Sequence, residues 1–157
     1  MLKQSLLLAG LAVLGAAHAQ EPAQADLSAN RAMWEAMRIS DYRYTLWQWY
    51  GNGFHPSPIG VTVRGGVVTS ARYLRYAFRP GADLEFDVSE AEDADASSRR
   101  TISQLFELAS QLMRQYGEHL EMTFDETYRF PLSISGHWPG ASDDYQTYKV
   151  TDFETLK

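Results

Sequence analysis

The chain has 157 residues, with 14 basic and 20 acidic side chains, a formal net charge of −6 and no cysteine. Its length fits a single domain with its own hydrophobic core. Without cysteine, the protein has no disulfide, thiol nucleophile, thiolate metal ligand or lipid-carrying cysteine. No basic stripe is present to neutralise phosphates, which excludes nucleic acid as a partner.

The first 19 residues have the pattern of a signal peptide. Lys3 supplies a positive start, residues 6–13 are apolar, and Ala17-His18-Ala19 has the small-x-small pattern that signal peptidase cleaves. We expect cleavage before Gln20 and a periplasmic or secreted protein without a stable membrane anchor. The alternative is a retained, anchor-like start, although the run is shorter than the ~20 residues that cross a bilayer.

After a leader at 20–27 that we expect to be disordered, the first half of the chain predicts a helix and three strands. The helix covers 28–38, with an apolar stripe of Met33, Trp34 and Met37. In the first strand, 41–50, alternation directs Tyr42, Tyr44 and Leu46 to the core and Trp47 and Trp49 to the opposite face. A hairpin at Gly65-Gly66 joins strands 59–63 and 67–76, with a bulge near Ser70 that turns Ala71 and Tyr73 inward.

The segment 80–100 is rich in acidic residues and poor in large apolar ones, so we expect a solvated linker there. Calcium binding by its acids is an alternative, although the run lacks the glycine and terminal glutamate of an EF-hand loop.

The second half again predicts a helix and three strands. Apolar residues recur at helical spacing over 101–116, and Gly117 ends the helix. Strands follow at 120–124, 128–134 and 145–153, and Pro131 makes the second of them an edge or bulged strand. We therefore expect one α+β domain over 28–157, an antiparallel sheet with two amphipathic helices on one face and a helix-three-strand unit that occurs twice.

The order and spacing of several segments resemble the exported bacterial proteins grouped as domain of unknown function 6174. The resemblance covers nearly all of the chain after the signal and implies export and one small domain, with no assigned activity. Many members carry a close cysteine pair after the first strand, where this chain has Trp47 to Pro56, so any role of that pair is lost here. The segments that carry the resemblance are Trp34 with Ile39-Ser40-Asp41-Tyr42-Arg43-Tyr44, Val61-Thr62-Val63-Arg64-Gly65-Gly66 with Val68 and Ser70, Thr101-Ile102 with Leu105-Phe106, Thr123-Phe124-Asp125 with Phe130-Pro131 and Ile134, and Tyr148 to Phe153.

An aromatic patch is the best candidate for a functional site. If the second face of the sheet is open, the two indoles of the first strand form an apolar binding surface, which the next loop and a later tryptophan extend. Burial of these rings under another segment is the alternative. We expect binding of a protein partner or small ligand of the cell envelope, without a cofactor. The candidate binding residues are Trp47, Trp49, Tyr50, Phe54, His55 and Trp138.

Catalytic and metal sites have little support in the sequence. His55 and His137 lie in predicted loops, and no pair of histidines has the spacing of a zinc site. No glycine-flanked serine elbow is present either. We therefore predict no catalytic or metal-binding residue, with an envelope hydrolase that uses these histidines and nearby acids as the alternative function.

Overall fold

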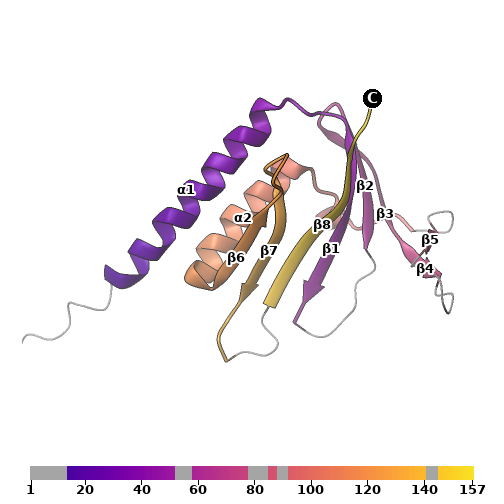
Figure 1. Ribbon diagram of the computed structural model, residues 1–157. Coiled ribbons are helices and arrows are strands. Elements are labelled where there is room, and N and C mark those ends of the chain that lie inside the picture. The colour runs from indigo at the N-terminus through magenta and orange to yellow at the C-terminus, as the bar shows by residue number, and fades with distance from the viewer. Residues whose placement is uncertain (1–13, 52–57, 78–84, 88–91, 141–144) are drawn as a thin grey trace, which may run out of the picture.

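The protein is an α+β structure built on one six-stranded antiparallel sheet and two long helices (Figure 1). The computed structural model describes residues 14–51, 58–77, 85–87, 92–140 and 145–157. The predicted fold class is confirmed, whereas an internal duplication stays a prediction. The helices are α1 (Leu14–Ala36) and α2 (Ile102–Tyr116), and the sheet contains β1 (Tyr42–Tyr50), β2 (Ile59–Arg64), β3 (Val67–Tyr73), β6 (Leu120–Phe124), β7 (Pro131–His137) and β8 (Tyr145–Thr155).

The last strand of the chain lies in the middle of the sheet. The strand order is β3-β2-β1-β8-β7-β6, so β8 separates β1 from β7 and joins the two halves of the chain. Leu46 of β1 lies opposite both Ile59 of β2 and Val150 of β8, and all three side chains are buried. The inward direction predicted for Tyr42, Tyr44 and Leu46 is confirmed by their burial.

Helix α2 has the boundaries that the sequence predicts. Thr101 caps it: its hydroxyl accepts a hydrogen bond from the Gln104 amide (3.2 Å), and the Gln104 side chain accepts one from the Thr101 amide (2.7 Å). Gly117 ends the helix with φ of 57°. The eight buried residues of α2 include Leu105, Phe106 and Ala109.

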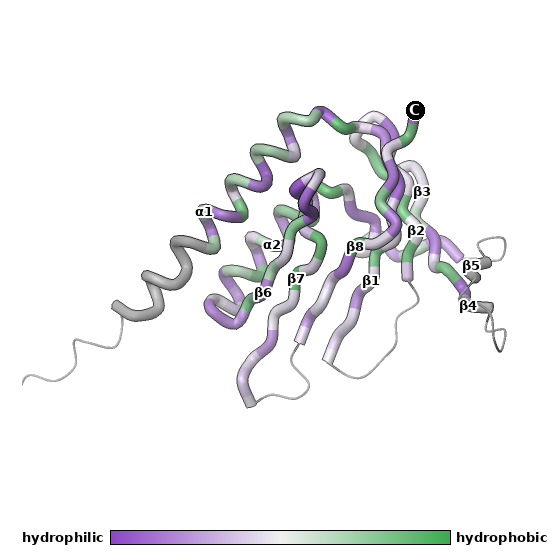
Figure 2. Tube along the Cα trace, viewed as in Figure 1, coloured by the Kyte–Doolittle hydropathy of each residue, from purple (hydrophilic) through white to green (hydrophobic). Residues whose placement is uncertain are grey.

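Both helices lie on one side of the sheet, with α2 against β7 and α1 against α2 (Figure 1). Hydrophobic and hydrophilic residues alternate along the two helices (Figure 2). None of the helices in the described part of the chain combines the length and apolar character of a membrane span.

Helix α1 differs from the prediction in its start and in its buried face. Residues 20–27, expected as a disordered leader, lie inside α1, and Leu27 is buried. The predicted stripe is also wrong, because Met33 and Met37 are 50% and 40% exposed. The buried residues are Leu27, Asn30 and Trp34, at spacings of three and four. The sequence pattern did not indicate this buried stripe because Asn30 is polar. Its amide donates hydrogen bonds to the carbonyl and the carboxylate of Asp26, which allows the side chain to be buried.

Two irregularities predicted in the strands are confirmed. Gly65 and Gly66 turn the β2–β3 hairpin with φ of 55° and 76°. The register shifts so that Val63 pairs with Val68 but Thr62 with Ser70, which directs Ala71 inward. Pro131 lies at the start of β7 beside a second shift, so β7 is bulged there although it is not an edge strand.

The segment expected to be an acidic linker contains regular structure in its described part. A small second sheet pairs β4 (Arg75–Ala77) with β5 (Glu85–Asp87), and a 3₁₀ turn, η1, covers Ala96–Ser98. Backbone bonds Tyr73 N–Glu92 O (3.0 Å) and Ala94 N–Ala71 O (2.9 Å) dock this segment on β3. The prediction failed because the pairing uses the backbone, while the described acidic side chains Glu92, Asp93 and Asp95 stay exposed. Asp93 lies 3.4 Å from Arg72.

Two buried tyrosines attach the beginning of α2 to β1. The Tyr42 hydroxyl accepts a hydrogen bond from the Ile102 amide (2.9 Å), and the Tyr44 hydroxyl donates one to the Arg100 carbonyl. Burial raises the pKa of both phenols, so both hydroxyls stay protonated in the neutral range. These bonds fix where the chain enters α2.

The buried face of α1, which contains Trp34, provides a test of how the core is packed. Trp34 packs edge-on against Tyr42, Phe130 and Phe153, with ring centroids 5.6–6.0 Å apart. Trp34→Ala should therefore lower the free energy of unfolding by about 3–5 kcal/mol in urea denaturation. The adjacent Met33→Ala, at a half-exposed position, is the matched control and should change it by less than about 0.5 kcal/mol. Equal losses in the two variants would contradict this packing.

Candidate functional site

The face of the sheet away from the helices is polar apart from a few aromatic side chains, and we call it the open face. On β1 it carries Arg43, Thr45, Trp47 and Trp49, which alternate with the core residues; Thr45 is buried on this face as well. Side chains directly opposite one another in a sheet share a face, so the ladder extends this surface across β8, β7 and β6. The two rows that begin at the tryptophans are Trp47–Lys149–Ser133–Thr123 and Trp49–Thr147–Ser135–Glu121.

Trp47 and Trp49 form a stacked pair on this face. Their ring centroids are 5.8 Å apart with an interplanar angle of 8°. The indole of Trp47 donates a hydrogen bond to the Thr151 hydroxyl (3.0 Å), which in turn donates to the Asp152 carboxylate (2.8 Å). Both rings are half-buried, so part of each indole surface is covered and part is accessible. The chain of hydrogen bonds orients the pair relative to β8.

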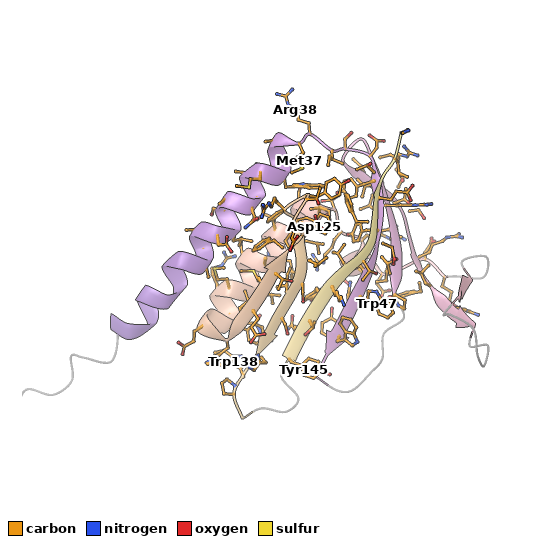
Figure 3. All side chains as sticks on the ribbon, viewed as in Figure 1. Met37, Arg38, Trp47, Asp125, Trp138 and Tyr145 are labelled. Carbon is orange, nitrogen blue, oxygen red and sulfur yellow. The ribbon has the colours of Figure 1, made fainter. Side chains whose placement is uncertain are left out.

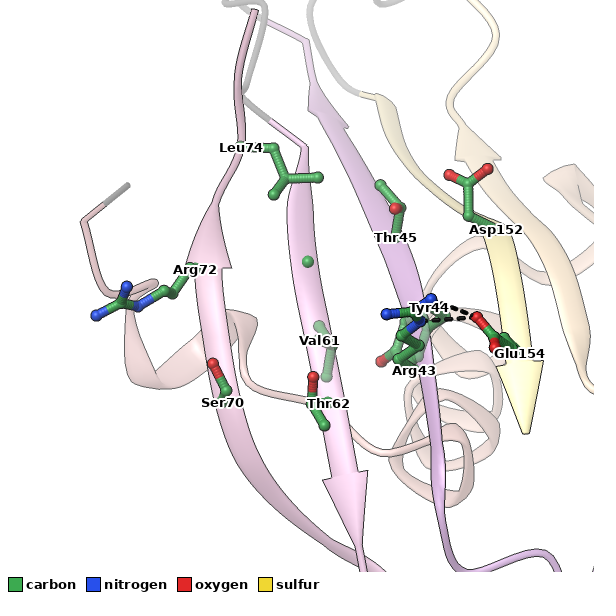
Figure 4. Close-up of a pocket in the computed structure, with 11 residues that line it drawn as sticks. Arg43, Tyr44, Thr45, Val61, Thr62, Ser70, Arg72, Leu74, Asp152 and Glu154 are labelled. Atoms are coloured by element: carbon green, nitrogen blue, oxygen red, sulfur yellow. Dashed lines mark hydrogen bonds and ion pairs between the residues drawn. The ribbon is translucent and has the colours of Figure 1, made fainter. Parts of the chain in front are cut away.

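A cavity of about 450 Å³ lies over β1, β2 and β3 (Figure 4). Neither tryptophan lines it; its nearest lining residue along β1 is Thr45, two positions before Trp47. This volume is within the range of small-molecule sites, about 300–1,000 Å³. Leu74 packs over Gly60 in the floor, where a Cβ on the glycine would lie 3.1 Å from the leucine side chain. The lining includes the hydroxyl residues Thr45, Thr62 and Ser70.

The charged groups of the cavity balance one another. Arg43 and Arg72 supply two positive charges, and Asp152 and Glu154 supply two negative ones. The Arg43 guanidinium binds Glu154 through two nitrogens, at 2.8 and 2.6 Å (Figure 4). Asp152 has φ of 53°, in the left-handed region, at the point where the β1–β8 register shifts. This bulge directs both Asp152 and Glu154 toward the cavity. Arg72 is also paired with Asp93, which lies outside the lining (3.4 Å).

The structure separates the residues predicted for the aromatic patch. Only Trp47 and Trp49 lie together on the open face. Tyr50 is 43% exposed at the end of β1, but it contacts Tyr148 on the helix side of the sheet (ring centroids 6.2 Å). Trp138 packs against Tyr116 of α2 (5.8 Å), away from Trp47 (Figure 3). Phe54 and His55 lie outside the described residues.

His137 lies at the end of β7, with its ring 6.3 Å from that of His119. Opposite it in the ladder is Tyr145, an aromatic residue on the open face that the sequence analysis did not select. Among the described residues, no group of three or more histidine, aspartate or glutamate side chains could hold a metal ion. The described acids of the 92–95 segment instead meet arginines or the hydroxyl of Tyr73.

Lys149, Thr151 and Asp152 were also missed by the sequence analysis, for two different reasons. Lys149 and Thr151 join the site because β8 lies beside β1, a long-range pairing that no local pattern indicates. Asp152 joins it through a bulge, and a single aspartate in a strand gives no local signal of one. Regular alternation alone would have placed the Asp152 side chain on the helix side.

Comparison with known proteins gives a family and no activity. Residues 26–155 match the model of a family of unknown function, DUF6174. Neither the curated proteins nor the solved structures contain a significant match to this chain. The matched region includes every strand of the sheet and all of α2. The chain therefore belongs to the DUF6174 family.

Proposed function

We propose that this protein is an exported, non-catalytic binding module that takes a neutral carbohydrate on its open face. The observation that carries the proposal is a stacked tryptophan pair on the same strand as a cavity of about 450 Å³ whose two arginines are already paired with acids. An envelope of sugar polymers surrounds an exported protein, so ligands of this class are available to it.

The chemistry of the open face fits a sugar ring. The C–H groups of a sugar pack on the flat surface of an indole, and its hydroxyls both donate and accept hydrogen bonds. Thr45, Thr62 and Ser70 supply hydroxyls in the cavity, and Ser135 and Thr147 form a hydroxyl pair (2.8 Å) beyond the tryptophans. Because Arg43 is paired with Glu154 and Arg72 with Asp93, neither arginine is free to bind an anionic ligand, which favours a neutral one.

The two alternatives, a protein partner and a hydrolase, agree less well with this surface. The centre of a protein–protein interface is typically rich in aromatic, methionine and arginine residues and poor in lysine, glutamate and serine. Here the rows that follow the two tryptophans contain Ser, Thr, Lys149 and Glu121. A hydrolase that uses His55 and His137 would need both histidines at one cleft. His137 is exposed at the end of β7 and is not part of the described cavity.

Export makes a separate prediction about the N-terminus. Ala17-His18-Ala19 precedes Gln20 in the pattern of a signal peptidase site. When the full-length gene is expressed in a host that processes such signals, N-terminal sequencing of the protein recovered outside the cytoplasm should begin at Gln20. An intact chain that stays in the cytoplasm would contradict export, while leaving the binding test below unaffected.

Replacing the tryptophan pair tests the binding site. Trp47→Ala/Trp49→Ala should reduce retention on immobilised neutral oligosaccharides, such as chito- and cello-oligosaccharides, by about tenfold or more, because the stacking surface is lost. Trp138→Ala is the matched control, since this tryptophan is 40% exposed but packs against α2.

Circular dichroism of both variants shows whether the sheet is retained. If the folded double variant binds the same sugars as well as the wild type, the open face is not the site. If the wild type binds no neutral oligosaccharide in the collection, the carbohydrate assignment is wrong.

A further inference from the structure

A pair of histidines lies at one end of the sheet, where β7 ends and β6 begins. His137 is the last residue of β7, and His119 is the last residue of a 3₁₀ turn, η2 (Gly117–His119), that leads into β6. Leu120 pairs with Gly136, so the two histidines face each other at the next step of the same ladder. Their ring centroids are 6.3 Å apart, with an interplanar angle of 53°.

Both imidazoles are accessible to a ligand from solvent. His137 is exposed, and the side chain of His119 is 30% exposed. The carboxylate of Glu118 lies 3.9 Å from Nε2 of His119. A negative charge beside the rings attracts a cation and repels an anion. The pair therefore offers two nitrogen ligands in surroundings that suit a positive ion.

Packing behind the pair holds both histidines in place. Tyr116 is buried against the backbone of Gly136, where any Cβ would collide with the phenol ring. Trp138 packs on the Tyr116 ring (centroids 5.8 Å) and on the His119 ring (5.7 Å). Because His137 lies between Gly136 and Trp138 in the chain, these contacts also fix its backbone. A metal site needs ligands that are held in this way by the surrounding packing.

The spacing of the two rings suits one metal ion bound between them. Zinc binds an imidazole nitrogen at about 2.0–2.1 Å, which places the ion roughly 3.2 Å from the centre of the ring. Two imidazoles on one ion then have centroids roughly 5–6.4 Å apart, depending on the angle at the metal. The observed 6.3 Å lies at the upper end of this range. A small rotation of the exposed His137 side chain shortens it.

We propose that His119 and His137 together bind a divalent metal ion that prefers nitrogen ligands, zinc or copper. Imidazole suits these ions, whereas magnesium and calcium take oxygen ligands. The described residues contain no group of three or more histidine, aspartate or glutamate side chains that could hold a metal, so water completes the coordination. With two protein ligands instead of the four of a structural zinc site, the affinity should be micromolar. The site does not depend on the carbohydrate proposed for the open face.

Isothermal titration calorimetry of the protein without a polyhistidine tag tests the proposal. Zinc chloride and copper(II) chloride should each bind at one ion per chain with a micromolar Kd. Copper should bind the more tightly of the two, as it does at most nitrogen sites. Magnesium chloride is the control for a general effect of divalent charge and should show no binding. The proposal is wrong if neither zinc nor copper binds more tightly than magnesium.

Substitutions show whether the ion is bound by this pair. His119→Gln and His137→Gln should each weaken binding by about tenfold or more, because changes that only support a metal ligand already cost that much. His55→Gln makes the same change at a histidine outside the pair and is the matched control, which should bind as the wild type does. If both His119→Gln and His137→Gln retain the wild-type affinity, the pair is not the site.

Trp138 supplies a local readout of where the ion lies. Its ring is 5.7 Å from that of His119, so copper(II) at the pair should quench its fluorescence, whereas zinc, with a filled d shell, should not. Trp138→Phe should remove most of the copper-dependent quenching and retain the binding measured by calorimetry. Trp47→Phe changes a tryptophan far from the pair and should keep the quenching (Figure 3). Quenching that persists in full in Trp138→Phe would place the copper elsewhere and contradict the proposal.

Discussion

The pairing of β8 with β1 is the constraint on which the rest of the structure depends. The last strand enters the middle of the sheet, so β3-β2-β1 and β7-β6 belong to one sheet only because β8 lies between them. The contact between Trp47 and Thr151 joins residues 104 positions apart in the chain. Closing so long a loop costs conformational entropy before the ladder forms, and the burial of Leu46 against Val150 offsets part of that cost.

The register of this pair also determines which residues lie on the open face. Opposite residues share a face, so the ladder places Lys149 beside Trp47 on the open face and Tyr148 beside Gln48 on the helix side. A shift of one residue would exchange these faces and bury the lysine. The bulge at Asp152 then directs two acids toward Arg43 and the cavity, while Phe153 stays with the aromatic core. Strand β8 thus supplies polar groups to the open face and the buried Tyr148 to the helix side of the sheet.

Local patterns in the sequence predicted the local parts of this fold. The apolar spacing of α2, the glycine that ends it and the turn glycines of the β2–β3 hairpin act within a few residues, and these predictions are confirmed. The buried face of α1 was mispredicted because Asn30 occupies a core position by bonding its own helix. The partner of β1 and the bulge at Asp152 follow from long-range contacts. No pattern within one segment indicates them, so the binding site was predicted only through its two tryptophans.

Hydrogen exchange of the backbone amides tests the central role of the β1–β8 pair most directly. If these strands hold the two halves of the sheet together, their amides should be among the slowest to exchange and should exchange only when the whole domain unfolds. The amides of β1 and β8 should then give the same opening free energy, equal to that of global unfolding. If β8 exchanges through a local opening while β1, β2 and β3 stay protected, the halves are stable separately and the account is contradicted.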